Sequence, residues 1–359
     1  MFKNQNKFSV IGLMSGTSLD GLDMAYCRFI RKKRKWFFCL VMAKTEHYSL
    51  PWKKRLSGAS LLNGEPLIML HRDYGKYCAI LLKKFISRNH ISLVNFISSH
   101  GHTVFHQPGR GVTFQIGDGA VMAAVTGIPA ITDFRSGDVV RGGEGAPLVP
   151  VGDELLFPQY DYCLNLGGFA NISFRENKKR IAFDICPCNI LLNRLSGMTG
   201  KEFDRNGSLA RKGNVNIPLL KKLNRINYYR LPPPKSLGRE WAENAVFPLF
   251  VRNRCSPEGK LRTAAEHIAQ QIARAITRYG DSEKKKILMT GGGAHNRFLV
   301  ERIGSLCTAE IILPEKKIID FKEALIFGFL GVLRWRGEKN CLKSVTGAER
   351  DSVGGCIYF

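Results

Sequence analysis

A short segment near the N-terminus, residues 16–23, contains two glycines, two hydroxyl residues and two acids between apolar runs. The apolar residues 8–13 before it and the alternating apolar residues after it predict a strand, a polar turn and a second strand. Glycine lets backbone amides approach an anion, hydroxyl groups donate hydrogen bonds, and Asp20 or Asp23 could hold a hydrated divalent cation. The pattern favours a phosphate-binding hairpin, with an ordinary tight hairpin as the alternative. It is not a P-loop, because the lysine and the following helix are missing from the sequence.

Two more glycine clusters lie where turns between elements are expected. Gly167 and Gly168 separate two apolar strands and repeat the arrangement of the first hairpin, which predicts a second phosphate-binding turn. Gly291, Gly292 and Gly293 follow a predicted strand and precede a predicted helix. A backbone without side chains would let a flat base or ribose lie against it, and a helix N-terminus favours anions. A plain strand-to-helix turn is the alternative for this third cluster.

The acid with the best position for catalysis is Asp184, which ends the strand sequence IAFD. Ligands of α/β proteins usually bind at strand ends, so a carboxylate there could act as a general base on water or on a sugar hydroxyl. The alternative is a structural role, in which Asp184 caps the helix expected to begin near Asn189.

Three histidines, His100, His102 and His106, lie close together after the predicted strand 93–98. In an extended segment they would share one face and could ligate a metal. Loop histidines that hydrogen-bond a polar substrate are the favoured interpretation.

The elements that must position these residues occur in two similar series. Strands are predicted at residues 8–13, 22–26, 36–43, 93–98 and 128–134, then at 162–166, 170–174, 181–183, 286–290 and 310–313; helices are predicted at 65–87, 118–126, 263–279, 297–306 and 322–334. Each series begins with three strands and a glycine turn. The repetition predicts two similar α/β domains facing each other across a cleft, with the glycine-rich residues 134–150 as a hinge or a substrate-binding loop.

Composition excludes some classes of protein. The chain of 359 residues has 54 Lys and Arg against 30 Asp and Glu, a formal charge of +24. Such a charge attracts polyanions, but the basic residues are spread along the chain without interleaved aromatics, so nucleic-acid binding is not expected as the main function. No apolar stretch is long enough to span a bilayer and no signal-peptide pattern is present, which predicts a cytoplasmic protein. The ten cysteines are scattered, which favours reduced thiols over a disulfide framework or a zinc site.

Several segments together resemble one family, the anhydro-N-acetylmuramic acid kinases of the sugar kinase, Hsp70 and actin superfamily. They are IGLMSGTSLDGLD, SHGHTVFHQP, QIGDG, DFRSGDVVRGGEGAPLVP, LNLGGFANIS, FDICPCN, TGKEFDRNG, LPPPKSLGREW, TGGGAHN, the Glu323-Ala324 pair and SVTGAERDSVGG. The resemblance extends from residue 11 to residue 355.

The resemblance implies two actin-like (ribonuclease H-like) domains flanking an ATP cleft, residues 1–132 joined by the tail 340–359, and residues 133–339. It implies an enzyme of peptidoglycan recycling that uses ATP and Mg²⁺ on 1,6-anhydro-N-acetylmuramic acid. Water adds to the anomeric carbon, the anhydro bridge opens, and O6 takes the γ-phosphate to give N-acetylmuramic acid 6-phosphate. A homodimer is also expected.

Residue by residue, the resemblance implies Asp184 as the general base. The residues implied for ATP are Gly16, Thr17, Ser18, Leu19, Asp20, Gly21, Leu22, Asp23, Gly167, Gly168, Asn171, Gly291, Gly292 and Gly293. Those implied for the sugar are Asp133, Arg135, Asn189 and Glu323, and those implied for Mg²⁺ are Asp20 and Asp23.

The chain departs from the family pattern near the proposed base. Cys186 and Cys188 replace two glycines of the family's Thr-Gly-Pro-Gly-Asn, and His102 stands where the family usually has glutamine. A side chain at a position of positive φ would cost on the order of 1 kcal/mol or more. Two other functions therefore stay open, a kinase of the same superfamily for another amino or anhydro sugar, and a protein that senses nucleotide or sugar without turnover.

Overall fold

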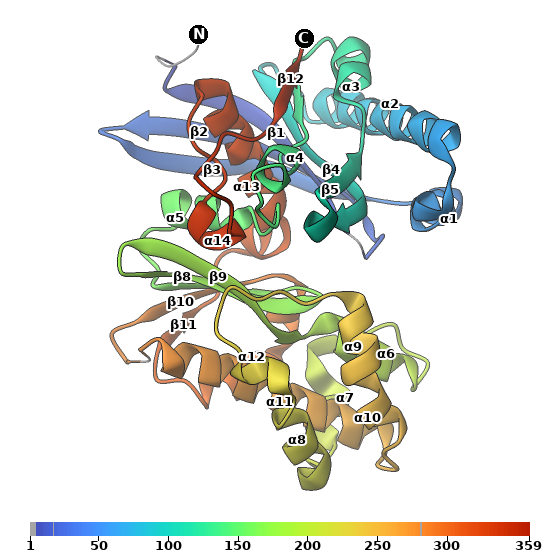
Figure 1. The fold of residues 1–359 in the computed structure, drawn as a ribbon, viewed down its shortest axis with the longest axis vertical. Helices are drawn as coiled ribbons and strands as arrows, with labels where there is room; N and C mark the ends of the chain where they lie inside the picture. Colours follow the sequence, from blue (N-terminus) through green and yellow to red (C-terminus); the bar gives the residue numbers. More distant parts are fainter. Residues whose placement is uncertain (1–4, 17, 281) are drawn as a thin grey trace. The chain divides into compact units, whose positions relative to one another are not determined.

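The computed structural model describes residues 5–16, 18–280 and 282–359, and its chain forms two compact units. Unit 1 comprises Met1–Phe157 and Phe321–Phe359, and unit 2 comprises Pro158–Asp320. In Figure 1 the blue-to-green and red parts of the chain make up unit 1, and the yellow-green to orange part makes up unit 2. The domain assignment expected from the sequence, with boundaries near residues 133 and 340, stays a prediction.

The sheet of unit 1 has the strand order β12-β6-β4-β1-β2-β3, with β5 beside β4. Its strands are β1 (Lys7–Ser15), β2 (Gly21–Lys32), β3 (Lys35–His47), β4 (Phe96–Gln107), β5 (Val112–Ile116), β6 (Ala130–Thr132) and β12 (Cys356–Tyr358). The first three strands are antiparallel neighbours, β4 pairs parallel with β1, and β6 pairs parallel with β4. The last strand of the chain, β12, adds antiparallel to β6 at the sheet edge.

Alternating side chains of β1 pack against helices on the two faces of this sheet. Ile11 and Leu13 lie in a core with α2 (Gly64–Arg88) and α3 (Gly119–Thr126), and burying each stabilises the fold by roughly 1.5–3 kcal/mol. Gly12 between them faces α13 (Lys316–Arg336), where an added Cβ would lie 1.9 Å from the carbonyl oxygen of Ala324. Only glycine therefore allows the backbone of α13 to approach so closely.

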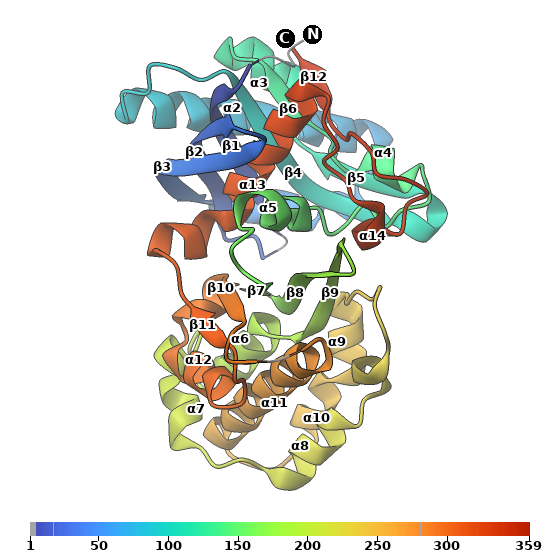
Figure 2. The ribbon, with the colours of Figure 1, turned by 90° about the vertical axis from the view of Figure 1, so that its left-hand side faces the viewer.

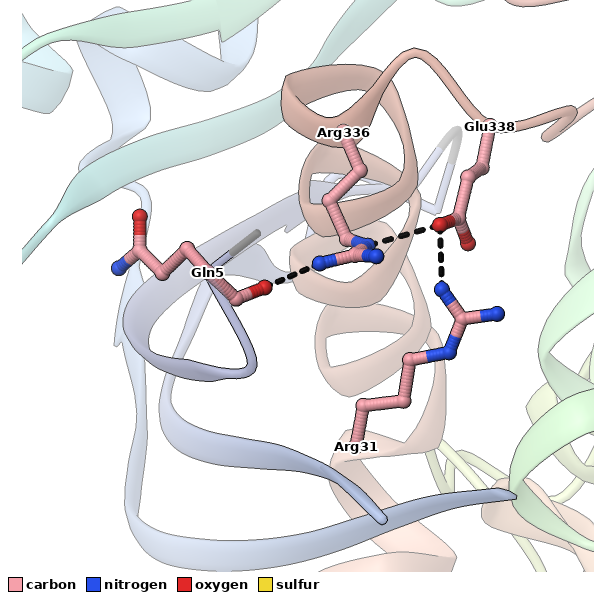
Figure 3. Close-up of polar contacts among 4 residues, drawn as sticks. All are labelled: Gln5, Arg31, Arg336 and Glu338. Carbon is pink, nitrogen blue, oxygen red and sulfur yellow. Dashed lines mark hydrogen bonds and ion pairs between the residues drawn. The ribbon is translucent and has the colours of Figure 1, made fainter. Parts of the chain in front are cut away.

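The C-terminal end of α13 is tied to the N-terminal part of unit 1 by an arginine and glutamate cluster (Figure 3). Arg336 donates to the backbone oxygen of Gln5 and, through Nε, to Oε1 of Glu338 at 2.8 Å. Arg31, near the end of β2, donates to the same Glu338 oxygen at 2.5 Å. One carboxylate thus joins the helix end to the β2 strand.

The sheet of unit 2 has the strand order β11-β10-β7-β8-β9. Its strands are β7 (Tyr162–Leu166), β8 (Phe169–Glu176), β9 (Lys179–Pro187), β10 (Lys286–Thr290) and β11 (Glu310–Ile312). The helix α11 (Pro257–Arg278) packs into the core of this unit with Ile268, Ile272 and Ile276, which are all fully buried. Figure 2 shows α11 and α12 (Arg297–Gly304) together beside this sheet.

The two sheets share one order, three antiparallel strands followed by two parallel strands beside the first. This order is that of ribonuclease H-like domains, so the fold class expected from the sequence is confirmed. The second hairpin of each meander has two turn residues with positive φ, Lys33 and Arg34 in unit 1 and Asn177 and Lys178 in unit 2, as two-residue hairpins prefer.

Shorter helices complete the two units. They are α1 (Leu50–Ser57), α4 (Ser136–Val139), α5 (Val149–Leu156), α6 (Asn189–Gly197), α7 (Ser208–Lys212), α8 (Ile217–Asn224), α9 (Arg239–Ala245), α10 (Phe247–Val251) and α14 (Lys343–Thr346), with 3-10 turns at Ala59–Leu61, Pro108–Arg110, Arg205–Gly207, Asn227–Arg230 and Gly292–His295. Within the described residues, no helix combines the length and the apolar character that crossing a membrane requires.

Candidate active site

Asp184 lies in β9 beside a bulge that interrupts its pairing with β8. The register places Cys186 opposite Ala170 and Asp184 opposite Asn171, so β9 has one extra residue, Ile185. A bulge bends its strand and changes the direction of neighbouring side chains. Ile185 is buried in the core of unit 2. The bulge therefore places Asn171, a predicted ATP residue, next to the predicted base.

The segment after α8 holds Asp184 at three points. The hydroxyl of Tyr228 donates to the backbone oxygen of Asp184 at 2.7 Å, and the Asp184 amide donates to the backbone oxygen of Lys235 at 3.2 Å. The amide of Leu237 donates to Oδ2 of the carboxylate at 2.9 Å. The other oxygen, Oδ1, makes no hydrogen bond with the part of the chain that the structure describes. Asp184 does not cap α6, whose N-cap residue is Cys188.

The carboxylate of Asp184 is a better proton acceptor than an ordinary aspartate. Burial raises its pKa to about 6, and the hydrogen bond from the Leu237 amide partly opposes this rise. Removal of water disfavours the charged form, so the carboxylate binds a proton more tightly. At neutral pH the group is still ionised, and its pKa lies close to the working pH, as a general base requires.

The other predicted residues of unit 2 meet at the ends of the parallel strands β7 and β10. The amides of Cys188 and Asn189 donate to the oxygens of Gly168 and Gly167 at 2.8 and 3.1 Å. The side chain of Asn189 donates to the backbone oxygen of Leu166 at 2.9 Å, so this amide joins α6 to β7.

The third glycine cluster reaches the same strand end. Gly291 has φ 84°, and an added Cβ would lie 2.4 Å from Oδ1 of Asn165. At Gly293 an added Cβ would lie 2.7 Å from Cβ of Leu166. An added Cβ at Gly168 would meet no atom within 4 Å, and one at Gly292 would make an ordinary contact of 3.5 Å with Nδ2 of Asn189. Gly291 and Gly293 thus allow the close approach of two chain segments, and Gly292 leaves bare backbone at the surface of the turn.

The two cysteines that follow Asp184 do not adopt the left-handed backbone conformation that would be strained for a residue with a side chain. Neither Cys186 nor Cys188 has a positive φ. Both thiols are fully buried among the apolar residues of unit 2, and burial raises the pKa of Cys188 to about 12. The cost expected for positive φ therefore does not arise, and both thiols are protonated at neutral pH.

In unit 1 the predicted phosphate turn joins β1 to β2. Thr17 lies outside the described residues; Gly16, Ser18 and Leu19 form the turn, and Leu22 and Asp23 already belong to β2. At Gly21 an added Cβ would lie 2.5 Å from the backbone oxygen of Glu46 in β3. This glycine is therefore required by packing between strands.

The two acids of this turn differ in their surroundings. The side chain of Asp20 is exposed, and Oδ1 of Asp23 accepts from the Thr45 hydroxyl at 2.5 Å. Carboxylate oxygens suit Mg²⁺, which in proteins commonly binds one or two carboxylates together with substrate phosphates and water. The donor set fits such an ion. The described residues contain no group of three or more His, Cys, Asp or Glu that could hold a metal by themselves.

The predicted sugar residues of unit 1 occupy the loop after β6 and the α13 helix. Asp133 has φ 56°, and its Oδ1 accepts from the amide and the hydroxyl of Ser136 at 3.3 and 2.5 Å. Its carboxylate thus fixes the start of α4. Arg135 donates through Nη1 to the backbone oxygen of Gly145 at 2.6 Å, and burial lowers its pKa to about 10.

Glu323 of α13 interacts electrostatically with this arginine. Burial raises the pKa of Glu323, whereas the charges of Lys322 and Arg135 oppose the rise. Arg135 in turn is supported by His100, whose Nε2 accepts from Nε and Nη2 of the guanidinium at 3.0 and 2.9 Å. The structure therefore brings Arg135 and Glu323 into one electrostatic neighbourhood, with His100 as an additional member.

The three histidines do not lie in a loop, contrary to the sequence interpretation. β4 continues through all of them, and each has a different partner: Arg135 for His100, Ser15 for His102 and Thr113 for His106. His100 and His102 thus pair with residues 35 and 87 positions away, and His106 pairs with Thr113 of the neighbouring strand β5. Burial lowers the pKa of all three.

Sequence reasoning missed the residues that hold the predicted base, Tyr228, Lys235 and Leu237. Tyr228 and Leu237, for example, hydrogen-bond to Asp184 from 44 and 53 positions further along the chain. No local sequence pattern reveals contacts over such distances. The segment LPPPKSLGREW, part of the family resemblance, was the one available signal.

The similarity of this chain to solved structures is weak. A search of solved structures finds the activator of the 2-hydroxyisocaproyl-CoA dehydratase from Clostridium difficile, with 14% identity, 89% of this chain and 93% of that chain covered, and a TM-score of 0.45. It also finds a glucokinase of the ROK family from Streptomyces griseus, with 9% identity, 89% and 97% covered, and a TM-score of 0.40.

Relatives by sequence are much more similar. The anhydro-N-acetylmuramic acid kinase of Francisella tularensis subsp. novicida is 33% identical, with 97% of this chain and 98% of the relative covered. That of Gloeobacter violaceus is 34% identical with the same coverage. The family profile described as anhydro-N-acetylmuramic acid kinase matches residues 8–359. The chain therefore belongs to the anhydro-N-acetylmuramic acid kinase family.

Proposed function

We propose that this protein is an ATP-dependent kinase that hydrolytically opens 1,6-anhydro-N-acetylmuramic acid and phosphorylates its O6, in peptidoglycan recycling. The proposal rests on the hydrogen bonds and the raised pKa of Asp184, in a chain that belongs to this family. Its backbone is held at two points, one carboxylate oxygen accepts from Leu237, and burial raises its pKa to about 6. This is an ionised but basic carboxylate with one oxygen that makes no hydrogen bond to the described chain.

The reaction then uses Asp184 as the base for water. Oδ1 accepts a proton from a water molecule as the water oxygen attacks the anomeric carbon of the sugar. The bond from that carbon to O6 breaks, and O6 attacks the γ-phosphorus of ATP as ADP leaves. The proton remains on Asp184 until solvent removes it, and the products are N-acetylmuramic acid 6-phosphate and ADP.

The glycine turns are assigned to ATP. In unit 2, Gly167, Gly168, Asn171 and residues 291–293 would hold the nucleotide, which agrees with the bare backbone at Gly168 and Gly292. In unit 1, residues 16–23 would bind phosphate oxygens. Asp20 and Asp23 would hold Mg²⁺, which when bound neutralises charge on the phosphates. Phosphoryl transfer depends mainly on positioning and charge neutralisation, so these groups suffice without a covalent intermediate.

The sugar is assigned to Arg135, Glu323, Asp133 and Asn189. Arg135 uses three of its five N–H groups on His100 and Gly145, which leaves two for the carboxylate of a muramic acid. Asp133 and Asn189 each hold backbone or hydroxyl groups of their own chain. We expect both to support the site rather than to provide most of the sugar affinity.

The experiment is a coupled assay of purified protein with ATP, Mg²⁺ and 1,6-anhydro-N-acetylmuramic acid, with ADP and sugar phosphate both quantified. One ADP per sugar phosphate is expected, and Asp184→Asn should retain ATP binding without turnover. Binding of both ligands by the wild-type protein without any phosphorylated sugar would refute the kinase proposal. Another anhydro or amino sugar turned over in preference would refute the substrate assignment alone.

We also propose that the protein acts in the cytoplasm, as the absence of a signal-peptide pattern in its sequence led us to expect, and that it forms a homodimer. Sedimentation velocity at several protein concentrations would test the dimer, and a monomer at assay concentration would exclude it as a requirement for activity.

A further inference from the structure

Four polar side chains of unit 1 form a continuous hydrogen-bonded row that ends beside the predicted phosphate turn. The hydroxyls of Tyr74 and Tyr48 lie 2.5 Å apart, the Tyr48 hydroxyl lies 2.7 Å from Ser15 Oγ, and Ser15 Oγ lies 2.9 Å from Nδ1 of His102. All four residues are buried. They come from α2, the residue after β3, the end of β1 and β4. Such a row must have a defined direction of donation, because each buried hydroxyl has one hydrogen to place.

The direction follows from the middle of the row. The Tyr48 hydroxyl donates to Ser15 Oγ, so the single hydrogen of Ser15 is left for another acceptor, and Nδ1 of His102 lies 2.9 Å away. Because Tyr48 gives its own hydrogen to Ser15, it accepts from Tyr74 in their 2.5 Å contact. Donation therefore runs outward, from Tyr74 to Tyr48, then to Ser15 and to Nδ1 of His102.

Outward donation determines where the imidazole carries its hydrogen. Nδ1 accepts from Ser15, so it has no hydrogen of its own. Burial lowers the pKa of His102 to about 4, which keeps the ring neutral at physiological pH. Burial also raises the pKa of Tyr48 well above its usual value, so Tyr48 stays a hydroxyl donor. The ring of His102 therefore carries its hydrogen on Nε2, an atom that makes no hydrogen bond to the described residues.

His102, with its Nε2–H donor, lies at the end of the sheet where ligands are expected to bind. β1 and β4 are parallel, and the register pairs His102 with Ser15, the last residue of β1. Gly16 and the rest of the predicted phosphate turn follow directly. Open α/β sheets bind ligands at this carboxyl end of parallel strands.

We propose that the row from Tyr74 through Tyr48 and Ser15 fixes His102 as an Nε2–H donor to an acceptor oxygen of a bound ligand. The acceptor is a phosphate oxygen of the nucleotide or an oxygen of the sugar, and only the identity of these ligands rests on the proposed function. A neutral imidazole with this hydrogen placement has one acceptor and one donor, as a glutamine amide has. A glutamine at position 102 would keep the same pattern of one acceptor and one donor.

The first test reads the hydrogen placement without any ligand. Two-dimensional NMR of protein with ¹⁵N-labelled histidine, at pH 7, distinguishes a protonated Nε2 from a protonated Nδ1. His102, assigned by loss of its signals in His102→Gln, is expected with the hydrogen on Nε2. A hydrogen on Nδ1 would overturn the proposal, whether or not the protein is a kinase.

Two matched variants test the direction of donation. Tyr48→Phe and Tyr74→Phe each remove one buried hydroxyl, but only Tyr48→Phe removes the donor to Ser15. We expect Tyr48→Phe to shift part of His102 to the Nδ1–H form, because Ser15 can then accept from the ring, whereas Tyr74→Phe leaves the tautomer unchanged. Equal effects of the two variants, or none, would contradict outward donation.

Calorimetric titration identifies the ligand oxygen. Mg²⁺ with a non-hydrolysable ATP analogue and 1,6-anhydro-N-acetylmuramic acid are titrated separately into wild-type, His102→Gln and His102→Leu proteins. His102→Leu should weaken one ligand by about 10- to 100-fold, as expected for a hydrogen bond to a charged or strongly polar acceptor. His102→Gln should stay within a few-fold of wild type. Unchanged affinity of His102→Leu for both ligands, or an equal loss in His102→Gln, would overturn the donor role.

Discussion

Replacing Asp184 by asparagine should abolish turnover and at the same time stabilise the protein above pH 6. The pKa of about 6 lies about 2 above the value of 3.8 for an unperturbed aspartate, and burial is the main cause. Each pKa unit corresponds to about 1.4 kcal/mol. Ionised Asp184 therefore destabilises the folded state by up to about 3 kcal/mol relative to a neutral group of the same shape. Asparagine is neutral, and its side-chain oxygen can still accept from the Leu237 amide.

The pH dependence has a defined sign. The folded state binds the Asp184 proton more tightly than the unfolded chain does, so this residue favours folding below pH 4. Its contribution falls as the pH rises from about 4 to about 6 and stays lower above that. The advantage of Asp184→Asn over wild type should thus be near zero at pH 4 and reach its full value at pH 7.5.

Differential scanning calorimetry at these two pH values measures the effect. For a body of the size of unit 2, about 3 kcal/mol corresponds to an increase in Tm of roughly 6–12 °C. Asp118→Asn in unit 1 serves as a control. Asp118 is the N-cap residue of α3, and an asparagine can accept from the same two backbone amides, so little change in stability is expected. A variant of Asp184 no more stable than wild type at pH 7.5 would refute the reasoning that burial raises this pKa. The kcat of the wild type should correspondingly fall below about pH 6, as the base becomes protonated.

Three further substitutions test other parts of the structure. Gly12→Ala should prevent native packing of α13, because its Cβ would lie 1.9 Å from the oxygen of Ala324; little soluble protein is expected, and a Tm close to wild type would contradict the contact. Tyr228→Phe removes one hydrogen bond to the backbone of Asp184 and should lower kcat several-fold with the KM for ATP unchanged; a change confined to KM would exclude a positioning role. Cys186→Gly should lower the unfolding free energy by about 1–3 kcal/mol, since it empties buried space and adds backbone freedom, while turnover is retained; a gain in stability would show that the thiol is strained.

The sequence predicted elements whose pattern is local. The apolar residues of α11 recur at helical spacing, and β7 and β10 are short apolar runs bounded by turns, so all three were found near their observed positions. The extension of β4 was missed, because its histidines are stabilised by Arg135 and Ser15 from elsewhere in the chain. Long-range pairing of this kind leaves no periodic signal.

The candidate site was likewise predicted only in part. The choice of Asp184 and of the glycine turns depended on residue types at strand ends, which the sequence contains. The bulge at Ile185 and the supporting contacts from Tyr228 and Leu237 depend on the folded arrangement. The raised pKa of Asp184 also depends on burial by residues distant in sequence. The bulge, the supporting contacts and the raised pKa could therefore not be predicted from the sequence.

The support of Asp184 by main-chain atoms has a consequence for mutagenesis. Lys235 contributes its carbonyl oxygen and Leu237 its amide, and replacing either side chain by alanine leaves both groups in place. An alanine scan would therefore miss the main-chain support at both positions. At Lys235 it would report only the loss of the side chain, which donates to the backbone oxygen of Tyr228 at 3.2 Å and lies over the rings of Phe183 and Tyr228. At 237 the donor to the proposed base persists in any residue that keeps an N–H group. Proline at that position is the one coded substitution that removes the donor itself.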